Sequence, residues 1–285
     1  MIKVMTDNAA NLPPELRAQY GITELCLTYT IDGEPVDISK PFDGHAFYEA
    51  MRKGAEVKTS MITPLAAREA MEPVLDRGDD VLYVGLSGGV SGTCWGVSVV
   101  AQELRERYPE RKVLTVDTLC ASMGQGLLVW LTVQELKHGA TLEEAARYAE
   151  DNRLHLCHWF TVDDLFFLKR GGRVSAATAL VGSALGIKPV LHVDNEGHLI
   201  NVSKARGRKN SILALVDRME KSAIEPEKQT VYISHGDCLA DAEFLAQEVR
   251  RRLQVPRIEI NYVGPVIGAH SGPGTLALFF LGTAR

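Results

Sequence analysis

The chain has 285 residues, 46% of them hydrophobic and 24% charged, with a formal net charge of -5. Such a composition is typical of a soluble globular protein with ample core material, in one large domain or two closely associated ones. The acidic balance argues against nucleic-acid binding. No apolar stretch reaches the ~18 residues of a membrane helix, and the opening MIKVMTDNAANLPPEL lacks the apolar region of a signal peptide.

The cysteines are scattered, with no CxxC pair and no cysteine–histidine spacing suited to zinc. Their odd number and the missing signal peptide predict a reducing, cytoplasmic location without a disulfide framework or a structural metal. No cofactor is expected either. The five cysteines are Cys26, Cys94, Cys120, Cys157 and Cys238.

The N-terminal part of the chain alternates short apolar runs with helical patterns. Residues 2–6 predict a strand, Pro13-Pro14 opens a helix that ends at Tyr20, and residues 22–31 predict another strand. Asp43 and Thr63 have the positions of helix N-caps.

Two continuous apolar strands follow, at residues 81–84 and 113–116, each between helical patterns. Thr141 and Glu144 form a capping-box pattern before a helix. Short buried strands between helices predict a mainly parallel sheet with helices on both faces.

The pattern changes near residue 160, where we place a boundary between an N-terminal α/β domain (1–160) and a C-terminal α+β domain (161–285), with a ligand cleft between them. An Asn195-Glu196-Gly197 turn between two strands predicts a hairpin, so the second sheet is expected to be mixed or antiparallel. The apolar run 276–281 is expected to be the final helix. The other strands of this half are expected at residues 158–162, 190–193, 199–203, 231–234 and 258–263.

The stretch GLSGGVSGT at residues 85–93 follows a strand and allows three chemical interpretations. One is a nucleophile elbow, G-x-S-x-G, with Ser87 as the nucleophile of a serine hydrolase. Asp117 or Asp237, followed by His270, would complete the triad. Two glycines directly after the serine argue against the immediate helix that an elbow needs.

A phosphate-binding loop is the second interpretation. A Walker loop needs a lysine before its serine or threonine, and a dinucleotide-binding turn needs G-x-G-x-x-G. The stretch 85–93 contains neither. This interpretation is therefore weaker than the first.

In the third interpretation, polar turns before helices hold an anion with hydroxyls and free backbone N–H groups. Ser91 belongs to one such turn, Thr59 to a second, and His270 with Ser271 to a third. Hydroxyls and one imidazole suit a carboxylate better than a polyphosphate. Taken singly, each turn is better explained as the cap of its own helix.

Taken together and in order, these turns resemble the motifs of the DegV family, from Lys3 nearly to the C-terminus. The opening Thr-Asp-Asn, the Ser-Gly-Thr turn and the Leu-Lys-Arg-Gly-Gly-Arg-Val-Ser stretch are similar to that family's patterns. The matching segments are residues 6–8 with 11–13, 58–60, 90–93, 116–118 with 121–126, 164–175, 187–189 and 264–274.

The resemblance implies a two-domain α/β protein that binds a long-chain fatty acid, such as palmitate or oleate, between its domains. It also implies that the protein has no chemistry of its own and presents the acid to a separate ATP-dependent kinase subunit that forms an acyl phosphate. A lipid-responsive regulatory protein remains an alternative. The implied carboxylate contacts are Thr59, Ser91, Gly92 and His270, and the possible phosphate or partner contacts are Arg173 and, more weakly, Lys204, Arg206 and Lys209.

The sequence departs from the family pattern at three turns, one of which has Gly88, Gly89 and Val90 before Ser91. Met61 and Ile62 stand where many members have a glutamine and a proline, and Thr118 replaces the usual serine after Asp117. These changes affect the expected chain preference more than carboxylate binding. The small-residue segment 176–185 either borders the acyl tail or simply packs closely on the sheet.

Overall fold

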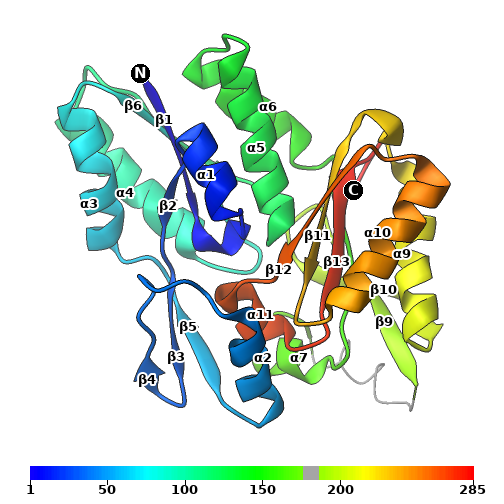
Figure 1. Ribbon diagram of the computed structural model, residues 1–285. Coiled ribbons are helices and arrows are strands. Elements are labelled where there is room, and N and C mark those ends of the chain that lie inside the picture. Colours follow the sequence, from blue (N-terminus) through cyan, green and yellow to red (C-terminus); the bar gives the residue numbers. More distant parts are fainter. Residues whose placement is uncertain (176–185) are drawn as a thin grey trace.

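The computed structural model describes residues 1–175 and 186–285. The segment 176–185, considered above as a border of the acyl tail, lies outside the described residues. Two sheets stand side by side, each with helices of its own (Figure 1). The predicted α/β fold, with a parallel N-terminal sheet and a mixed C-terminal sheet, is confirmed.

The N-terminal sheet has four parallel strands in the order β2-β1-β6-β7. Its faces are seen most clearly at β6, where Val81 and Tyr83 pack against α3 and α4 while Leu82 and Val84 pack toward α5 and α6. Both faces are therefore apolar, as expected for a parallel sheet between helices. The strands are β1 (Ile2–Asp7), β2 (Thr23–Leu25), β6 (Asp80–Gly85) and β7 (Val113–Asp117), and the helices are α1 (Pro14–Tyr20), α3 (Pro64–Asp76), α4 (Thr93–Arg107), α5 (Met123–Lys137) and α6 (Leu142–Asn152).

The helix starts agree with the predicted caps. The side chain of Thr63 accepts a hydrogen bond from the Ala66 N–H at the start of α3. Thr141 and Glu144 form the reciprocal capping box of α6. Asp43 caps α2 (Gly44–Arg52) in the same way as Thr63 caps α3.

The predicted strand over residues 22–31 is wrong as a single element, because the chain breaks at Cys26 and Leu27. Its first part is β2 of the parallel sheet, and its second part is β3 (Thr28–Ile31) of a separate antiparallel sheet. The side chain of Asn8 donates to the Leu27 carbonyl and accepts from its N–H, which fixes the break. The remaining strands of the small sheet are β4 (Glu34–Pro35) and β5 (Val57–Ser60).

The C-terminal sheet has six strands in the order β10-β9-β8-β13-β11-β12, and only the β11–β12 pair is parallel. The predicted hairpin at residues 195–197 joins β9 to β10. Helices α9 and α10 cover the outer face of this sheet (Figure 1). The elements are β8 (Leu156–Thr161), β9 (Ile187–Val193), β10 (Leu199–Arg206), β11 (Thr230–His235), β12 (Arg257–Tyr262), β13 (Leu276–Leu281), α9 (Arg208–Ser222) and α10 (Leu239–Leu253).

The expected final helix at residues 276–281 is instead β13, a strand inside the six-stranded sheet. It pairs with β8 on one side and β11 on the other. A six-residue run without polar interruptions fits a buried strand as well as a helix, and periodicity alone does not separate the two. Residues Leu276 to Phe280 are all buried.

Helix α5 lies between the two sheets and joins their cores. Leu127 and Leu128 of this helix belong to one apolar cluster with Leu82 of the parallel sheet and with Phe160 and Phe279 of the six-stranded sheet. The two halves of the chain therefore share a core. The predicted division near residue 160 runs through β8, which belongs to the six-stranded sheet.

Candidate functional site

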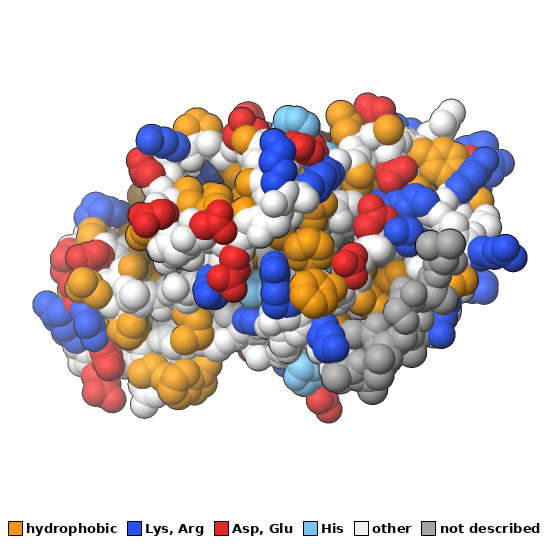
Figure 2. Space-filling view, turned by 90° about the horizontal axis from the view of Figure 1, so that it is seen from below, with side chains coloured by type: hydrophobic (Ala, Val, Ile, Leu, Met, Phe, Trp, Pro, Cys, Tyr) orange, Lys and Arg blue, Asp and Glu red, His pale blue; other side chains and the backbone are white. Residues whose placement is uncertain are grey.

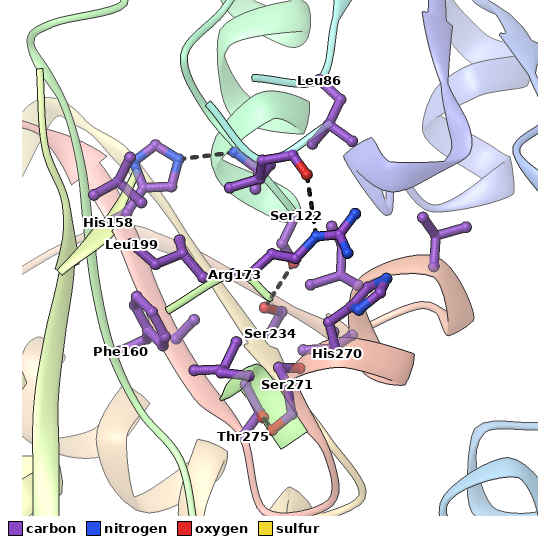
Figure 3. Close-up of a pocket in the computed structure, with 18 of the residues that line it drawn as sticks. Leu86, Ser122, His158, Phe160, Arg173, Leu199, Ser234, His270, Ser271 and Thr275 are labelled. Atoms are coloured by element: carbon purple, nitrogen blue, oxygen red, sulfur yellow. Dashed lines mark hydrogen bonds between the residues drawn. The ribbon is translucent and has the colours of Figure 1, made fainter. Parts of the chain in front are cut away.

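A cavity lies at the junction of the two sheets, beside the short helices α7 (Phe166–Arg170) and α11 (Pro265–Ser271) (Figure 3). It contains about 770 Å³ of empty space, counting the solvent at its open mouth. Most of its lining is apolar. The apolar side chains are Leu27, Leu86, Val90, Ala121, Phe160, Leu168, Val193, Leu199, Val263, Val266, Ile267, Ala277 and Phe279.

Thr59 and His270 line this cavity and contact each other. The Oγ1 atom of Thr59 lies 2.9 Å from Nε2 of His270, although 211 residues separate them. Thr59 belongs to β5, where the strand alternation turns it toward α11. Both side chains are partly exposed, so the pair stands at the cavity's mouth.

The place of His270 in the fold differs from the expected one. The sequence predicts it at a turn before a helix, but it occupies the last turn of α11, and the strand β13 comes next. His270 is therefore not followed by a helix whose N-terminus could point at a bound anion. Thr59 likewise lies inside a strand, four residues before the N-cap Thr63 of α3.

The His270 imidazole is neutral at neutral pH. Burial lowers the pKa of His270 to about 4, and the nearby charges of Arg173 and Arg170 act in the same direction. His270 therefore adds no positive charge to the site at neutral pH. His270 offers a polar ring nitrogen instead.

Ser91 and Gly92 lie at the N-terminus of α4, where Gly92 is the N-cap. Ser91 lines the cavity; its hydroxyl donates to Thr93 Oγ1 at 3.0 Å and accepts from the Thr93 N–H at 3.2 Å. The N–H of Gly92 has no hydrogen-bond partner in the described part of the chain. At this helix end the dipole favours an anion.

Arg173 also lines the cavity, and Figure 3 shows its guanidinium near His270. Its Nε–H donates to the Val90 carbonyl at 3.1 Å, and its Nη1 donates to the carbonyl of Gly171. These bonds hold a half-buried guanidinium next to His270, where it can meet a phosphate or carboxylate.

Three other candidate cations lie elsewhere. Lys204 and Arg206 are on β10, whose side chains alternate between half-buried and exposed, and both belong to the exposed set. Lys209, in α9, places its ammonium over the ring of Phe244. None of the three lines the cavity, so they do not contribute to a carboxylate site there.

The hydrogen bonds around Ser87 do not assemble a hydrolase triad. Ser87 is buried, and its hydroxyl donates to the Gly197 carbonyl at 2.9 Å, in the turn between β9 and β10. Asp117 accepts from the N–H groups of Gly88 and Leu119. Asp237 pairs instead with Arg52 and His45, and His270 contacts Thr59.

The same contacts explain the glycines of this loop. A side chain on Gly89 would meet the backbone of Glu196 and Gly197 at 2.6–2.7 Å. The glycine-rich stretch 85–93 thus serves two purposes. Its first half packs against the β9–β10 turn of the six-stranded sheet, and its second half forms the N-terminus of α4 beside the cavity.

Deeper in the cavity lie buried polar side chains, of which the sequence analysis named only Ser271, in an anion-binding turn. His158 is fully paired, since its Nδ1–H donates to the Leu156 carbonyl and its Nε2 accepts from the Ala121 N–H (Figure 3). The others are hydroxyls: Ser122, Ser234, Ser271 and Thr275. Ser122 and Ser271 fall within the DegV-like segments, but only the fold shows that they face one cavity.

The described residues contain no cluster of three or more histidine, cysteine, aspartate or glutamate side chains that could hold a metal ion. The cysteines are all free thiols. Within the described part of the chain, no helix is long and apolar enough to cross a membrane.

Comparison with known proteins places this chain in a family. A family model described as "Uncharacterised protein, DegV family" matches residues 1–283. The chain belongs to the DegV family. A DegV domain-containing protein of Clostridium perfringens is 42% identical over 284 residues, covering 99% of this chain and 98% of that protein.

Solved structures of DegV proteins superpose over almost the whole chain. A DegV family protein of Thermus thermophilus, described by its fatty acid binding, is 29% identical with a TM-score of 0.87, and 98% of each chain is covered. DegV of Bacillus subtilis, described as a fatty acid binding protein, is 28% identical with a TM-score of 0.82, again over 98% of each chain.

Two acidic residues in the DegV motifs have structural roles here. Asp7, at the end of β1, accepts hydrogen bonds from the Tyr83 hydroxyl and the Leu86 N–H, and burial raises its pKa. Asp117, at the end of β7, orders the loop at Gly88. Both position the strand ends that border the cavity.

Proposed function

We propose that this protein binds a long-chain fatty acid such as palmitate or oleate in the cavity between its two sheets. The observation that carries the proposal is the Thr59–His270 pair at the mouth of a cavity whose remaining walls are mostly apolar. Such a combination matches a ligand with one polar end and a long apolar body.

The carboxylate head would lie among Thr59, His270, Ser91 and Gly92. The Thr59 hydroxyl and the Gly92 N–H supply donors, and the Ser91 hydroxyl can turn its proton from Thr93 to the carboxylate. The N-terminus of α4 supplies a favourable dipole. A hydrogen bond to a charged group contributes about 1.5–3 kcal/mol. The Thr59–His270 bond orients both groups before the acid arrives.

The acyl tail would fill the apolar interior between Phe160, Leu168 and Phe279. Burial of each methylene contributes about 0.8 kcal/mol, so the ~14 methylenes of palmitate supply on the order of 11 kcal/mol before the costs of association. The tail therefore supplies most of the affinity, and the head group fixes the direction of entry.

Mass spectrometry of the natively purified protein tests this proposal. The native mass should exceed the sequence mass by one fatty acid, which denaturation releases. An Ala277→Trp variant, which fills the cavity from β13, should carry less of it. Absence of any bound acid, together with no binding of added palmitate or oleate, would contradict the proposal.

We further propose that the protein has no chemistry of its own and presents the bound acid to a separate ATP-dependent kinase subunit. Arg173 supports this role, because its guanidinium stands at the cavity beside the proposed carboxylate site and could meet a new phosphate. With ATP, palmitate and the kinase subunit of the same organism, acyl phosphate should form. Arg173→Ala should reduce its formation more than it reduces acid affinity.

If the wild-type protein binds the acid but no acyl phosphate forms with the kinase subunit, the kinase role is wrong. The remaining interpretation is then a regulatory protein that responds to the lipid. The two roles share the same binding site and differ only in the step after binding.

A further inference from the structure

The hydroxyl of Ser271 is a polar group without a partner at the wall of the cavity. Ser271 is 4% exposed and lines the cavity, and its Oγ has no hydrogen-bond partner among the described residues. Buried hydroxyls are nearly always paired, so an unpaired one requires an explanation. Figure 3 shows Ser271 next to Thr275, whereas the His270 ring points toward Arg173.

A second polar feature of the cavity is a chain of hydroxyls with a fixed direction. The Asn11 amide donates to the Asn8 carbonyl, so its Oδ1 accepts the proton of Ser122 at 2.9 Å. Ser122 has no second proton, and Ser234 must therefore donate across their 3.1 Å contact. Ser122 and Ser234 present only lone pairs to the cavity.

The backbone of Ser122 is strained, with φ 54° and ψ −148°. This region of the Ramachandran map is almost restricted to glycine, and residues held there concentrate at functional sites. This conformation places the Ser122 hydroxyl between Asn11, which follows β1 of the parallel sheet, and Ser234 of β11. The position of this polar group is thus built into the fold.

We propose, on the basis of the fatty acid binding proposed above, that the cavity is selective for an acyl chain that carries a hydroxyl group along its body. A plain methylene chain that filled the cavity would displace water and leave the Ser271 hydroxyl unpaired. A hydroxyl on the chain can accept the proton of Ser271 and donate its own proton to a lone pair of Ser234. A keto group could only accept, so it could meet Ser271 but not Ser234.

Titration of the protein with stearate, 10-hydroxystearate and 12-hydroxystearate tests this selectivity. The wild-type protein should bind at least one hydroxystearate about tenfold more tightly than stearate, because a site built for a hydroxyl discriminates against a chain that lacks it. Ser271→Ala should abolish that preference while stearate still binds. The corresponding keto acid should bind the wild-type protein less tightly than the hydroxy acid.

Thr161→Val is the matched control. The Thr161 hydroxyl is also buried and unpaired, but Thr161 does not line the cavity, so this variant should keep the wild-type preference. Equal affinity of the wild-type protein for stearate and both hydroxystearates would overturn the inference, and so would a preference that survives in Ser271→Ala. If no acid binds at all, the proposed function itself fails.

Discussion

Gly171 lies so close to the imidazole of His270 that a side chain at position 171 would overlap the Nδ1 atom of His270. Gly171 ends α7 and has an ordinary helical φ of −73°, so the absence of a side chain serves the packing of His270 rather than the backbone conformation. The Leu-Lys-Arg-Gly-Gly-Arg stretch thus sets the position of a residue nearly a hundred positions away.

Replacement of Gly171 by alanine is therefore expected to displace His270 and weaken fatty acid binding about tenfold, which corresponds to about 1.4 kcal/mol. Gly96→Ala in α4 is the matched control, because a side chain there meets open space. It should leave the affinity unchanged. Equal affinities of the two variants for palmitate would show that the Gly171 contact does not position the site.

Loss of either partner of the Thr59–His270 pair should weaken binding. Thr59→Val and His270→Ala each remove a polar group near the proposed carboxylate, so each is expected to raise the Kd for palmitate about 10- to 100-fold. Because the two groups contact each other, the double variant should lose less binding free energy than the two single variants lose together. His138→Ala, at the exposed end of α5, should have no effect; strictly additive losses would contradict a shared site.

Two serines of the stretch 85–93 should give opposite phenotypes. Ser87→Ala leaves the Gly197 carbonyl without its donor and is expected to lower the free energy of unfolding by about 1–3 kcal/mol, with palmitate affinity unchanged. Ser91→Ala should weaken binding with little effect on stability. Denaturant titrations and palmitate titrations of both variants check this.

The same pair of variants tests the hydrolase alternative. The protein should not turn over nitrophenyl esters through Ser87, because that hydroxyl is buried against the second sheet. Ester hydrolysis that disappears in Ser87→Ala and survives in Ser91→Ala would contradict the assignment.

Stability should fall as the pH is lowered from neutrality. Burial lowers the pKa of both His192 and His270 to about 4, well below the ordinary 6.5. Between these values the unfolded chain takes up a proton at each histidine and the folded protein does not, so the folded state is favoured fully above pH 6.5 and progressively less toward pH 4.

Between pH 7 and pH 5, each of these histidines is expected to lower the free energy of unfolding by about 2 kcal/mol. His270→Gln should therefore reduce the pH-dependent loss by about that amount. Free energies of unfolding from denaturant titrations at the two pH values give the comparison. An equal loss in the variant and the wild-type protein would contradict a buried neutral His270.

Much of the fold could be predicted from local pattern. The capping box at Thr141 and Glu144, the N-cap at Thr63 and the hairpin turn at residues 195–197 are each determined by a few adjacent residues, and each is present. The prediction of a helix for the apolar run 276–281 is wrong, because the state of this run depends on two neighbouring strands from other parts of the chain.

The site was less accessible to sequence reasoning. Thr59 and His270 meet across 211 residues, and local signals explain each of them equally well as a capping or packing residue. Only the resemblance to DegV motifs brings them together in advance. The unpaired hydroxyl of Ser271 and the strained Ser122 are tertiary features, which no residue pattern could have shown.

Binding of one carboxylate at Thr59 and His270, with its tail inside the cavity, underlies the predictions on ligand affinity. A crystal structure of the protein with palmitate that carries bromine on its terminal carbon tests this arrangement most directly. We predict anomalous bromine density within the cavity, near Phe160 or Phe279, with the carboxylate within hydrogen-bond distance of Thr59. Bromine density on the outer surface, or a carboxylate far from His270, would contradict the account.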